Sequence, residues 1–302
     1  MMGTDSTTED SDLIANWSKR MAPLAEPDQN MMTVDVEDYF QVEAFFRVIE
    51  RKDWDSYACR VEQNTDQILS MFQSTGAKAT FFTLGWIAKR YPALIRRIVE
   101  SGHEVASHGL EHRRADSQTR SEFLSDLKES KSLLEDVSGT AIKGYRAASF
   151  SITRKNLWAL DAIAEAGYKY SSSVYPVRHD LYGIPDAPRF AFKPFASSDF
   201  LEIPITSFKF GKTNLPCGGG GFFRLLPYWW SSFQLRKVRS ANEGPCMFYF
   251  HPWEIDPEQP RIRNAPIISR FRHYTNLGSM QNRLRRLLFE FAWQRIDKVY
   301  PV

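Results

Sequence analysis

The chain has 302 residues, 43% of them hydrophobic, and a formal net charge of +3. This length and composition suit one large α/β domain with an ample core, and the small net charge without a basic block argues against nucleic acid as a partner. The three cysteines are scattered without a Cys-x-x-Cys pair, which argues against a disulfide framework.

The sequence shows no basic segment followed by an apolar leader and no run near the ~20 apolar residues of a membrane span. We therefore expect no transmembrane segment and a cytoplasmic protein. Residues 1–28 are polar and lack a periodic pattern, so they are predicted to form a flexible N-terminal tail. The folded part is expected to cover residues 29–302, and the sequence leaves its oligomeric state open.

The first predicted element is a buried strand over residues 31–36, and it ends among carboxylates. Asp35 lies within this strand, and Glu37 and Asp38 follow it directly. Three acids so close together repel one another unless a cation is present. The alternative is a solvated turn with Asp38 as a helix N-cap, and the histidines further along the chain favour the cation.

Those histidines, His108 and His112, lie four positions apart in a chain with only six histidines. On a helical turn such residues point the same way, and paired imidazoles are the usual first half of a zinc site. One carboxylate and two imidazoles would leave positions open for water or substrate, as in a catalytic site. The elements predicted before the pair are a helix near 61–72, a strand over 79–83, a helix from Pro92 to a stop at Gly102, and a strand over 103–107.

Helices and strands continue to alternate in the second half, which predicts a mostly parallel sheet wrapped by helices. The glycines at 218–221 predict a flexible loop over 211–224, either a mobile lip over a groove or a linker. The acids, His108, Arg146 and His251 fall at or just after strand ends, the edge where α/β barrels carry active sites. The later elements are a helix over 154–166, strands over 169–173, 201–205 and 246–250, and an amphipathic helix around 283–288 that is expected to dock on the domain.

Taken together, ordered segments of this chain resemble the polysaccharide deacetylases with a NodB-like domain. The resemblance implies an α/β fold, a distorted (β/α) barrel of about seven strands, with a family-specific C-terminal extension over about 257–302. The segments around Asp35 and His251 further resemble a bacterial subgroup associated with exopolysaccharide loci. The segments that carry the resemblance are Thr33–Asp38, Ala79–Thr83, His103–His112, Gly144–Phe150 and Phe248–Trp253.

The resemblance implies a metal-dependent hydrolase that removes N-acetyl groups from an amino-sugar polysaccharide or its precursor, in exopolysaccharide biosynthesis. Asp35 would be the base, Arg146 would orient it, and His251 would protonate the leaving amine. His108 and His112 would bind the metal together with a carboxylate. Zinc is the expected ion, with cobalt, nickel or manganese as alternatives, and an N-acetylated glycan is the expected partner.

The sequence departs from the family pattern in two places. The first motif is Asp-Val-Glu-Asp instead of two adjacent aspartates or Asp-x-Asp, so either Glu37 or Asp38 could be the third metal ligand. Ala148 stands where the arginine motif commonly has proline, and this loosens the specification of the loop backbone.

Two other functions fit part of the pattern. His-x-x-Glu-His is also the signature of the inverted-zincin metallopeptidases, but Gly109 and the strand-like segment before it argue against the helix that this signature needs. A degenerate domain that binds glycan without turnover is the second alternative, and the retention of every reactive group argues against it. Trp229, Trp230 and Trp253 are candidates for exposed aromatic faces that stack on sugars.

Overall fold

The computed structural model describes residues 13–22, 29–241 and 244–302. Most of the predicted tail, residues 1–12 and 23–28, lies outside the described residues. The intervening segment contradicts the tail prediction, because Trp17 is fully buried and its ring centroid lies 4.8 Å from that of Phe192. A buried side chain of this size anchors a segment by removing a large apolar area from water.

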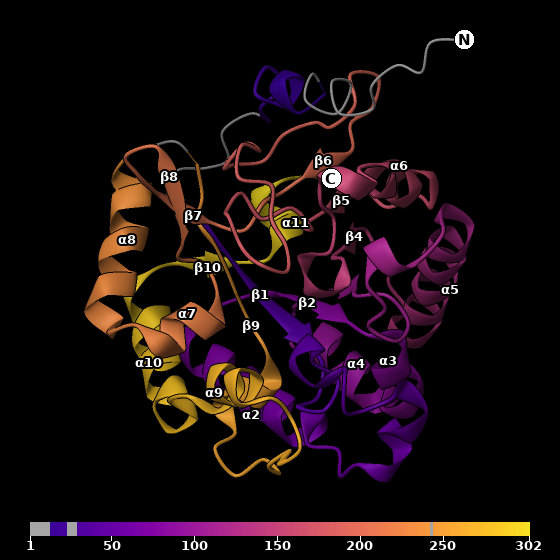
Figure 1. Cartoon of the computed structure of the whole chain (residues 1–302), viewed down its shortest axis with the longest axis vertical. Helices are drawn as coiled ribbons and strands as arrows, with labels where there is room; N and C mark the ends of the chain where they lie inside the picture. Colours follow the sequence, from indigo (N-terminus) through magenta and orange to yellow (C-terminus); the bar gives the residue numbers. More distant parts are fainter. Residues whose placement is uncertain (1–12, 23–28, 242–243) are drawn as a thin grey trace.

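A parallel sheet forms the centre of the molecule (Figure 1). Seven of its strands curl into a half-barrel, which confirms the predicted α/β barrel architecture. In spatial order these strands are β9 (Met247–Phe250), β1 (Asn30–Val36), β2 (Thr80–Thr83), β3 (Glu104–Ser107), β4 (Gly144–Tyr145), β5 (Tyr170–Ser171) and β6 (Leu201–Glu202), and the short β10 (Trp293–Gln294) pairs with the start of β1.

The central strand β1 is buried along its whole length. Burial on both faces is typical of parallel sheets and explains the nearly continuous apolar run at its start. Because side chains alternate along a strand, Met31, Thr33 and Asp35 share one face. Met31 packs in the inner cluster with Phe82, so this face looks into the barrel and carries Asp35 with it.

Helices cover the outer face of the sheet (Figure 1). The predicted helix at Pro92 is confirmed, and Gly102 follows it with a φ of +79°. The longest helix starts with a capping box between Thr119 and Glu122, which satisfies two backbone donors. The helices are α2 (Val61–Thr75), α3 (Gly85–Arg90), α4 (Pro92–Glu100), α5 (Arg120–Ser138), α6 (Trp158–Glu165), α7 (Gly220–Leu225), α8 (Tyr228–Ser240), α9 (Ile267–Tyr274), α10 (Leu277–Glu290) and α11 (Ile296–Val299).

Short 3-10 helices occupy many of the connections between these elements. They are η1 (Glu43–Phe45), η2 (Arg51–Ser56), η3 (Ala115–Ser117), η4 (Ala148–Phe150), η5 (Arg154–Asn156) and η6 (Pro252–Ile255). Ala148, which replaces the family's proline, is buried in η4, and Ala147 N–H before it donates to the Ser173 hydroxyl at 2.9 Å. Side-chain and turn hydrogen bonds therefore hold this loop where proline's fixed φ is missing.

The glycine-rich segment is not the flexible loop that the sequence predicted. It begins with an antiparallel hairpin of β7 (Ser207–Phe210) and β8 (Thr213–Pro216). Gly218 N–H then donates to Thr206 at 3.1 Å, and Tyr249 N–H donates to the Gly218 carbonyl at 2.8 Å. A Cβ at Gly219 would lie 2.5 Å from the Tyr249 ring. Close packing between the segment after β6 and strand β9 therefore requires these glycines.

The C-terminal residues pack into the same core as the rest of the chain. α10 buries Met280, Leu284 and Leu287 against the main core, which confirms the docked amphipathic helix predicted around 283–288. β10 follows it and extends the sheet next to β1. In the part of the chain that the structure describes, no helix is both long and apolar enough to cross a membrane.

Candidate active site

The three acids at the end of β1 point in different directions. Asp38 caps the start of α2: its carboxylate accepts hydrogen bonds from the backbone N–H groups of Tyr39, Arg60 and Val61 at 2.9, 2.6 and 2.9 Å. Burial raises the pKa of Asp38 to about 6, although these N–H donors oppose the shift. The Asp38 carboxylate therefore stabilises the start of α2. Its position contradicts its prediction as a metal ligand.

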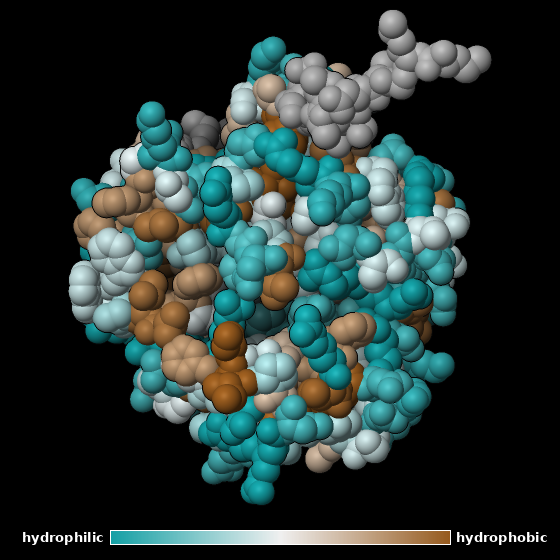
Figure 2. Space-filling model, viewed as in Figure 1, coloured by the Kyte–Doolittle hydropathy of each residue, from teal (hydrophilic) through white to brown (hydrophobic). Residues whose placement is uncertain are grey.

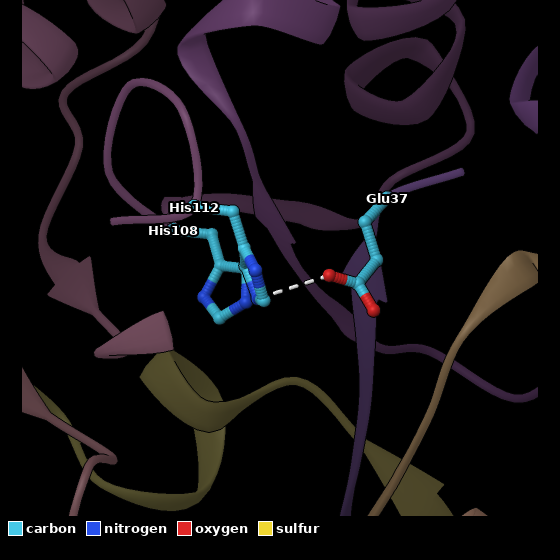
Figure 3. Close-up of side chains that lie close together, drawn as sticks. All are labelled: Glu37, His108 and His112. Atoms are coloured by element: carbon cyan, nitrogen blue, oxygen red, sulfur yellow. Dashed lines mark ion pairs between the residues drawn. The ribbon is translucent and has the colours of Figure 1, made fainter. Parts of the chain in front are cut away.

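Glu37 lies beside the two histidines instead. Its carboxylate, His108 and His112 each offer a ligand atom within 4.8 Å of the others, and among the described residues they form a cluster that could hold a metal ion. All three side chains are buried. Figure 3 shows the two imidazoles side by side, facing the carboxylate. Two histidines and one carboxylate are a donor set that suits zinc and leaves a position open for catalysis.

The histidines reach this cluster from an irregular loop after β3, which corrects the expected helical turn. Gly109 has a φ of +80° and His112 a φ of +52°, and neither value occurs in a right-handed helix. Backbone bonds fix the loop, since Gly85 N–H donates to the Gly109 carbonyl at 2.8 Å. Arg51 also donates to the His112 carbonyl at 3.0 Å. The ring centroids end 5.1 Å apart.

The hydrogen bonds around the cluster leave its ligand atoms free for a cation. Nδ1 of His108 lies 2.8 Å from the Arg146 carbonyl, so Nδ1 carries the hydrogen and Nε2 keeps its lone pair. Nε2 of His112 lies 3.0 Å from Oε2 of Glu37. That buried oxygen has no hydrogen bond of acceptable geometry to any described residue. The imidazole nitrogen of His112 and this carboxylate oxygen are close enough to share either a proton or a metal ion.

The electrostatics keep the cluster in its metal-binding protonation states. Burial raises the pKa of Glu37, but the charges of His112 and His251 outweigh this effect and lower it to about 2. Burial lowers the pKa of His108 to about 4. An ionised carboxylate and a neutral imidazole are the forms that bind metal ions.

Asp35 lies beside the cluster and is paired with Arg146, as the sequence predicted. Nη1 of the fully buried Arg146 donates to Oδ1 of Asp35 at 2.5 Å. Other donors of the guanidinium bind the Ser172 carbonyl at 3.1 Å and the Thr33 hydroxyl at 2.9 Å. The Phe82 ring lies 4.0 Å below the guanidinium carbon. Arg146 is thereby fixed on several sides and holds the Asp35 carboxylate in one orientation.

His251 approaches the same point from β9. Its Nε2 lies 3.5 Å from Oε1 of Glu37 and 3.9 Å from Oδ2 of Asp35. Its Nδ1 lies 2.8 Å from Oε1 of Glu254, whose other oxygen accepts a bond from Nε of Arg224 at 2.6 Å. Burial lowers the pKa of His251, but the charge of Glu37 and the contact with Glu254 raise it to about 9. His251 therefore carries a proton aimed at the site.

Two residues of this network were absent from the sequence prediction. Glu254 follows His251 by three positions and also accepts a hydrogen bond from the His251 backbone N–H at 3.1 Å, in the reciprocal pattern of a capping box. The Ser/Thr-x-x-Glu pattern is a known sequence signal, but histidine in the first position hides it. Arg224 lies 30 residues before Glu254, and no local pattern links them.

The tryptophan candidates occupy different places. Trp253 is buried, stacks on His273 with ring centroids 4.0 Å apart, and donates from Nε1 to Glu37 at 3.3 Å. Its prediction as an exposed sugar-stacking face is wrong, because the ring is buried and contacts Glu37 and His273. Trp229 is largely exposed, and Trp230 stacks on Phe233, both on α8.

The structure also bears on the alternative peptidase function. An inverted-zincin site needs both histidines and the glutamate between them on one helix. Here residues 108–114 form no helix, and Glu111 is exposed. This geometry contradicts the inverted-zincin alternative.

Comparisons with known proteins divide the chain in two. Residues 53–171 match the polysaccharide deacetylase family model, and residues 172–301 match a domain of unknown function, DUF3473. A peptidoglycan-N-acetylglucosamine deacetylase of Bacillus cereus is 30% identical over 105 residues, which are 35% of this chain and 38% of that protein. The chain thus aligns with well under half of the length of this relative.

Two solved structures have a similar fold. One is a Mycobacterium smegmatis protein assigned as a polysaccharide deacetylase, with a TM-score of 0.56, 17% identity, and coverage of 91% of this chain and 90% of that one. The other is the PuuE allantoinase, with a TM-score of 0.57, 14% identity, and coverage of 99% and 96%. At such identities the likeness concerns the fold alone. The sequence match identifies residues 53–171 as a polysaccharide deacetylase domain.

Proposed function

We propose that this protein is a metal-dependent hydrolase that removes the N-acetyl group from an amino sugar of a glycan. The observation that carries the proposal is the buried Glu37–His108–His112 cluster, with Asp35 on one side and His251 on the other. The B. cereus relative, named as an N-acetylglucosamine deacetylase, supports the same chemistry.

Zinc is the ion that we propose for the cluster, and cobalt, nickel or manganese could replace it. Glu37 would bind through a carboxylate oxygen, and His108 and His112 through Nε2. The Oε2 of Glu37, which lies 3.0 Å from Nε2 of His112, and the carbonyl-bound Nδ1 of His108 support this assignment. A divalent ion at such a site lowers the pKa of water from ~15.7 towards ~7 and polarises the acetyl carbonyl.

Asp35 acts as the general base in this proposal. Its Oδ1 is occupied by Arg146, so Oδ2 is the oxygen that faces the site and takes a proton from the attacking water. The buried guanidinium binds Oδ1 and stops the carboxylate from rotating. The role of Arg146 is therefore to position Asp35.

His251 acts as the general acid. Its Nε2 faces Asp35 and Glu37 across the site, and it would deliver a proton to the leaving amine. Glu254 accepts the Nδ1 hydrogen and fixes the ring plane. General acid catalysis by a positioned side chain typically contributes ~10²–10⁴-fold to the rate.

We further propose an N-acetylglucosamine-containing polysaccharide or its precursor as the substrate, in exopolysaccharide biosynthesis and in the cytoplasm. The name of the B. cereus relative supports the sugar. The resemblance of the segments around Asp35 and His251 to the exopolysaccharide-associated subgroup supports the pathway class.

The test is acetate release from N-acetylglucosamine oligomers by the protein as purified, after chelator treatment, and after zinc is returned. We expect release that chelation abolishes and zinc restores. Binding of the oligomers without release under all three conditions would support the non-catalytic glycan-binding alternative and overturn the proposal.

A further inference from the structure

The outer face of α9 exposes aliphatic side chains to an unusual degree. Ile267 is 81% exposed, Ile268 67% and Phe271 59%. Ile267 is the most exposed large hydrophobic side chain in the described ranges. Leaving such groups in water forgoes the favourable free energy that burial of each side chain would contribute. A face of this kind is expected to meet an apolar phase.

α9 also lies at the rim of the candidate active site. His273 on its inner side stacks on Trp253, which donates to Glu37. Arg224 at the end of α7 donates to the carbonyls of His273 and Thr275, and this fixes the C-terminal end of α9. Figure 1 places α9 near the carboxyl ends of β1 and β9, and Figure 2 shows brown surface in the same area, beside a recess.

Positive charge surrounds the exposed face. Residues 257–276 contain four arginines and one acidic residue, Glu258. All four arginines, Arg261, Arg263, Arg270 and Arg272, are exposed, and Arg272 pairs with the exposed Asp180 at 3.4 Å. The segment therefore carries a net charge of +3, as large as that of the whole chain.

This combination points to one kind of partner. Two of the three exposed side chains are isoleucines, which lack the flat aromatic face on which sugars stack, so most of the surface does not suit the glycan itself. α9 has eight residues and is only ~12 Å long. Its exposed face is therefore smaller than the ~800 Å² that each partner buries in a stable protein interface. Aliphatic side chains ringed by arginines are the pattern of an element that lies in the interface of an anionic membrane.

We propose that α9 docks this face of the protein on an anionic lipid bilayer. Ile267, Ile268 and Phe271 enter the head-group region, and Arg263 and Arg270 contact lipid phosphates. Docking in this orientation holds the rim of the active site against the membrane surface. The interaction rests on α9 and its arginines and does not require the proposed deacetylase activity.

Flotation with lipid vesicles tests the proposal. We expect the full chain to float with vesicles of equal parts phosphatidylglycerol and phosphatidylcholine, and to float less as salt rises. The I267S/I268S/F271S variant should bind about tenfold or more weakly because it buries less apolar area. The R263Q/R270Q variant should lose about 25-fold, since each basic residue near an anionic surface contributes about fivefold.

Matched controls separate docking from general stickiness. Phe289 is 75% exposed near the far end of α10, so F289S removes an equally exposed apolar side chain away from α9. K209Q/K212Q removes two charges from the exposed β7–β8 hairpin. Both controls should float like the unmodified protein.

Three outcomes would overturn the proposal. One is flotation of folded I267S/I268S/F271S, checked by circular dichroism, at the level of the unmodified protein. Another is no flotation of the unmodified protein. The third is a dimer in light scattering that this variant dissociates, which would show that a second copy covers the face. None of these outcomes bears on acetate release, so the proposed function is judged separately.

Discussion

The two halves of the chain hold their site histidines by different means. In the first half, backbone groups position the two histidines of the cluster: a carbonyl orients His108, and backbone hydrogen bonds shape the loop that carries His112. In the second half, a chain of charged side chains positions His251 through Glu254 and Arg224. The family match over 53–171 covers the histidine loop, whereas His251 lies in the domain of unknown function.

This difference has physical consequences. A backbone carbonyl stays in place when a neighbouring side chain is replaced, so the histidine loop should tolerate substitutions without unfolding. The buried ion pairs Arg224–Glu254 and Arg146–Asp35 are different. Removing one partner leaves the other charge buried and uncompensated, at a cost of about 3–5 kcal/mol. Variants of the histidine cluster should therefore report on metal and catalysis, and variants of the ion pairs on catalysis and stability together.

The largest effect is expected from the metal cluster. H108A or H112A should lose both bound zinc and acetate release, because two remaining ligands cannot hold a catalytic ion. Elemental analysis and acetate assays measure the two losses, and H179A, which removes a histidine outside the cluster, should retain both. Stoichiometric zinc in the H108A/H112A double variant would refute the cluster assignment.

The second effect concerns the base beside the cluster. D35N should keep its zinc while kcat falls by about 10³-fold, within the ~10²–10⁴ range of general acid–base catalysis. Asparagine retains the shape but cannot take the proton. Loss of zinc in D35N would instead make Asp35 a metal ligand.

The third effect concerns His251, the proposed general acid, which lies in the second half of the chain. H251A should keep its zinc and lose about 10²-fold in kcat with little change in KM, as expected for a group that acts in the transition state. Elemental analysis measures the bound zinc, and steady-state kinetics measure kcat and KM. A variant that binds substrate poorly but turns it over normally would contradict the role.

The fourth effect sharpens the comparison between the halves. E254Q should lower kcat by about tenfold, since the ring of His251 loses its charged support, and should lower the free energy of unfolding by about 3 kcal/mol, since Arg224 stays buried. Urea unfolding and kinetics measure both. An unchanged kcat with lowered stability would reduce Glu254 to a structural role.

The smallest effect should come from the acid that turned away from the cluster. D38N should retain zinc and nearly full activity, because Asp38 serves the backbone donors at the start of α2. Weakening this cap should cost about 1 kcal/mol of stability. If D38N loses zinc, Asp38 and not Glu37 is the ligand.

Local sequence patterns predicted much of the site. Strand periodicity placed Asp35 on β1, and the alternation of elements placed Asp35, His108, Arg146 and His251 at one edge of the sheet. The choice between Glu37 and Asp38 could not be predicted, because it depends on the N–H groups of Arg60 and Val61, over twenty residues away. Such tertiary contacts leave no trace in a local pattern.

The remaining errors have similar causes. The glycines at 218–221 resemble a flexible loop in sequence, yet the small size of Gly219 and Gly220 allows close packing against Tyr249 and Glu254. The histidine loop has helical spacing, but the left-handed conformations of Gly109 and His112 break the helix. Trp17 lay in a polar context, and only its contact with Phe192 shows that it is anchored. In each case a distant contact decided the local conformation.

The central claim is that Glu37, His108 and His112 bind the catalytic metal together. The most direct test is an anomalous difference map, measured at the zinc absorption edge from crystals of the protein loaded with zinc. We predict one peak at ~2.0–2.2 Å from a carboxylate oxygen of Glu37 and from Nε2 of both histidines. A peak bound by Asp35 or Asp38 in place of Glu37, or no peak between these three residues, would contradict the account.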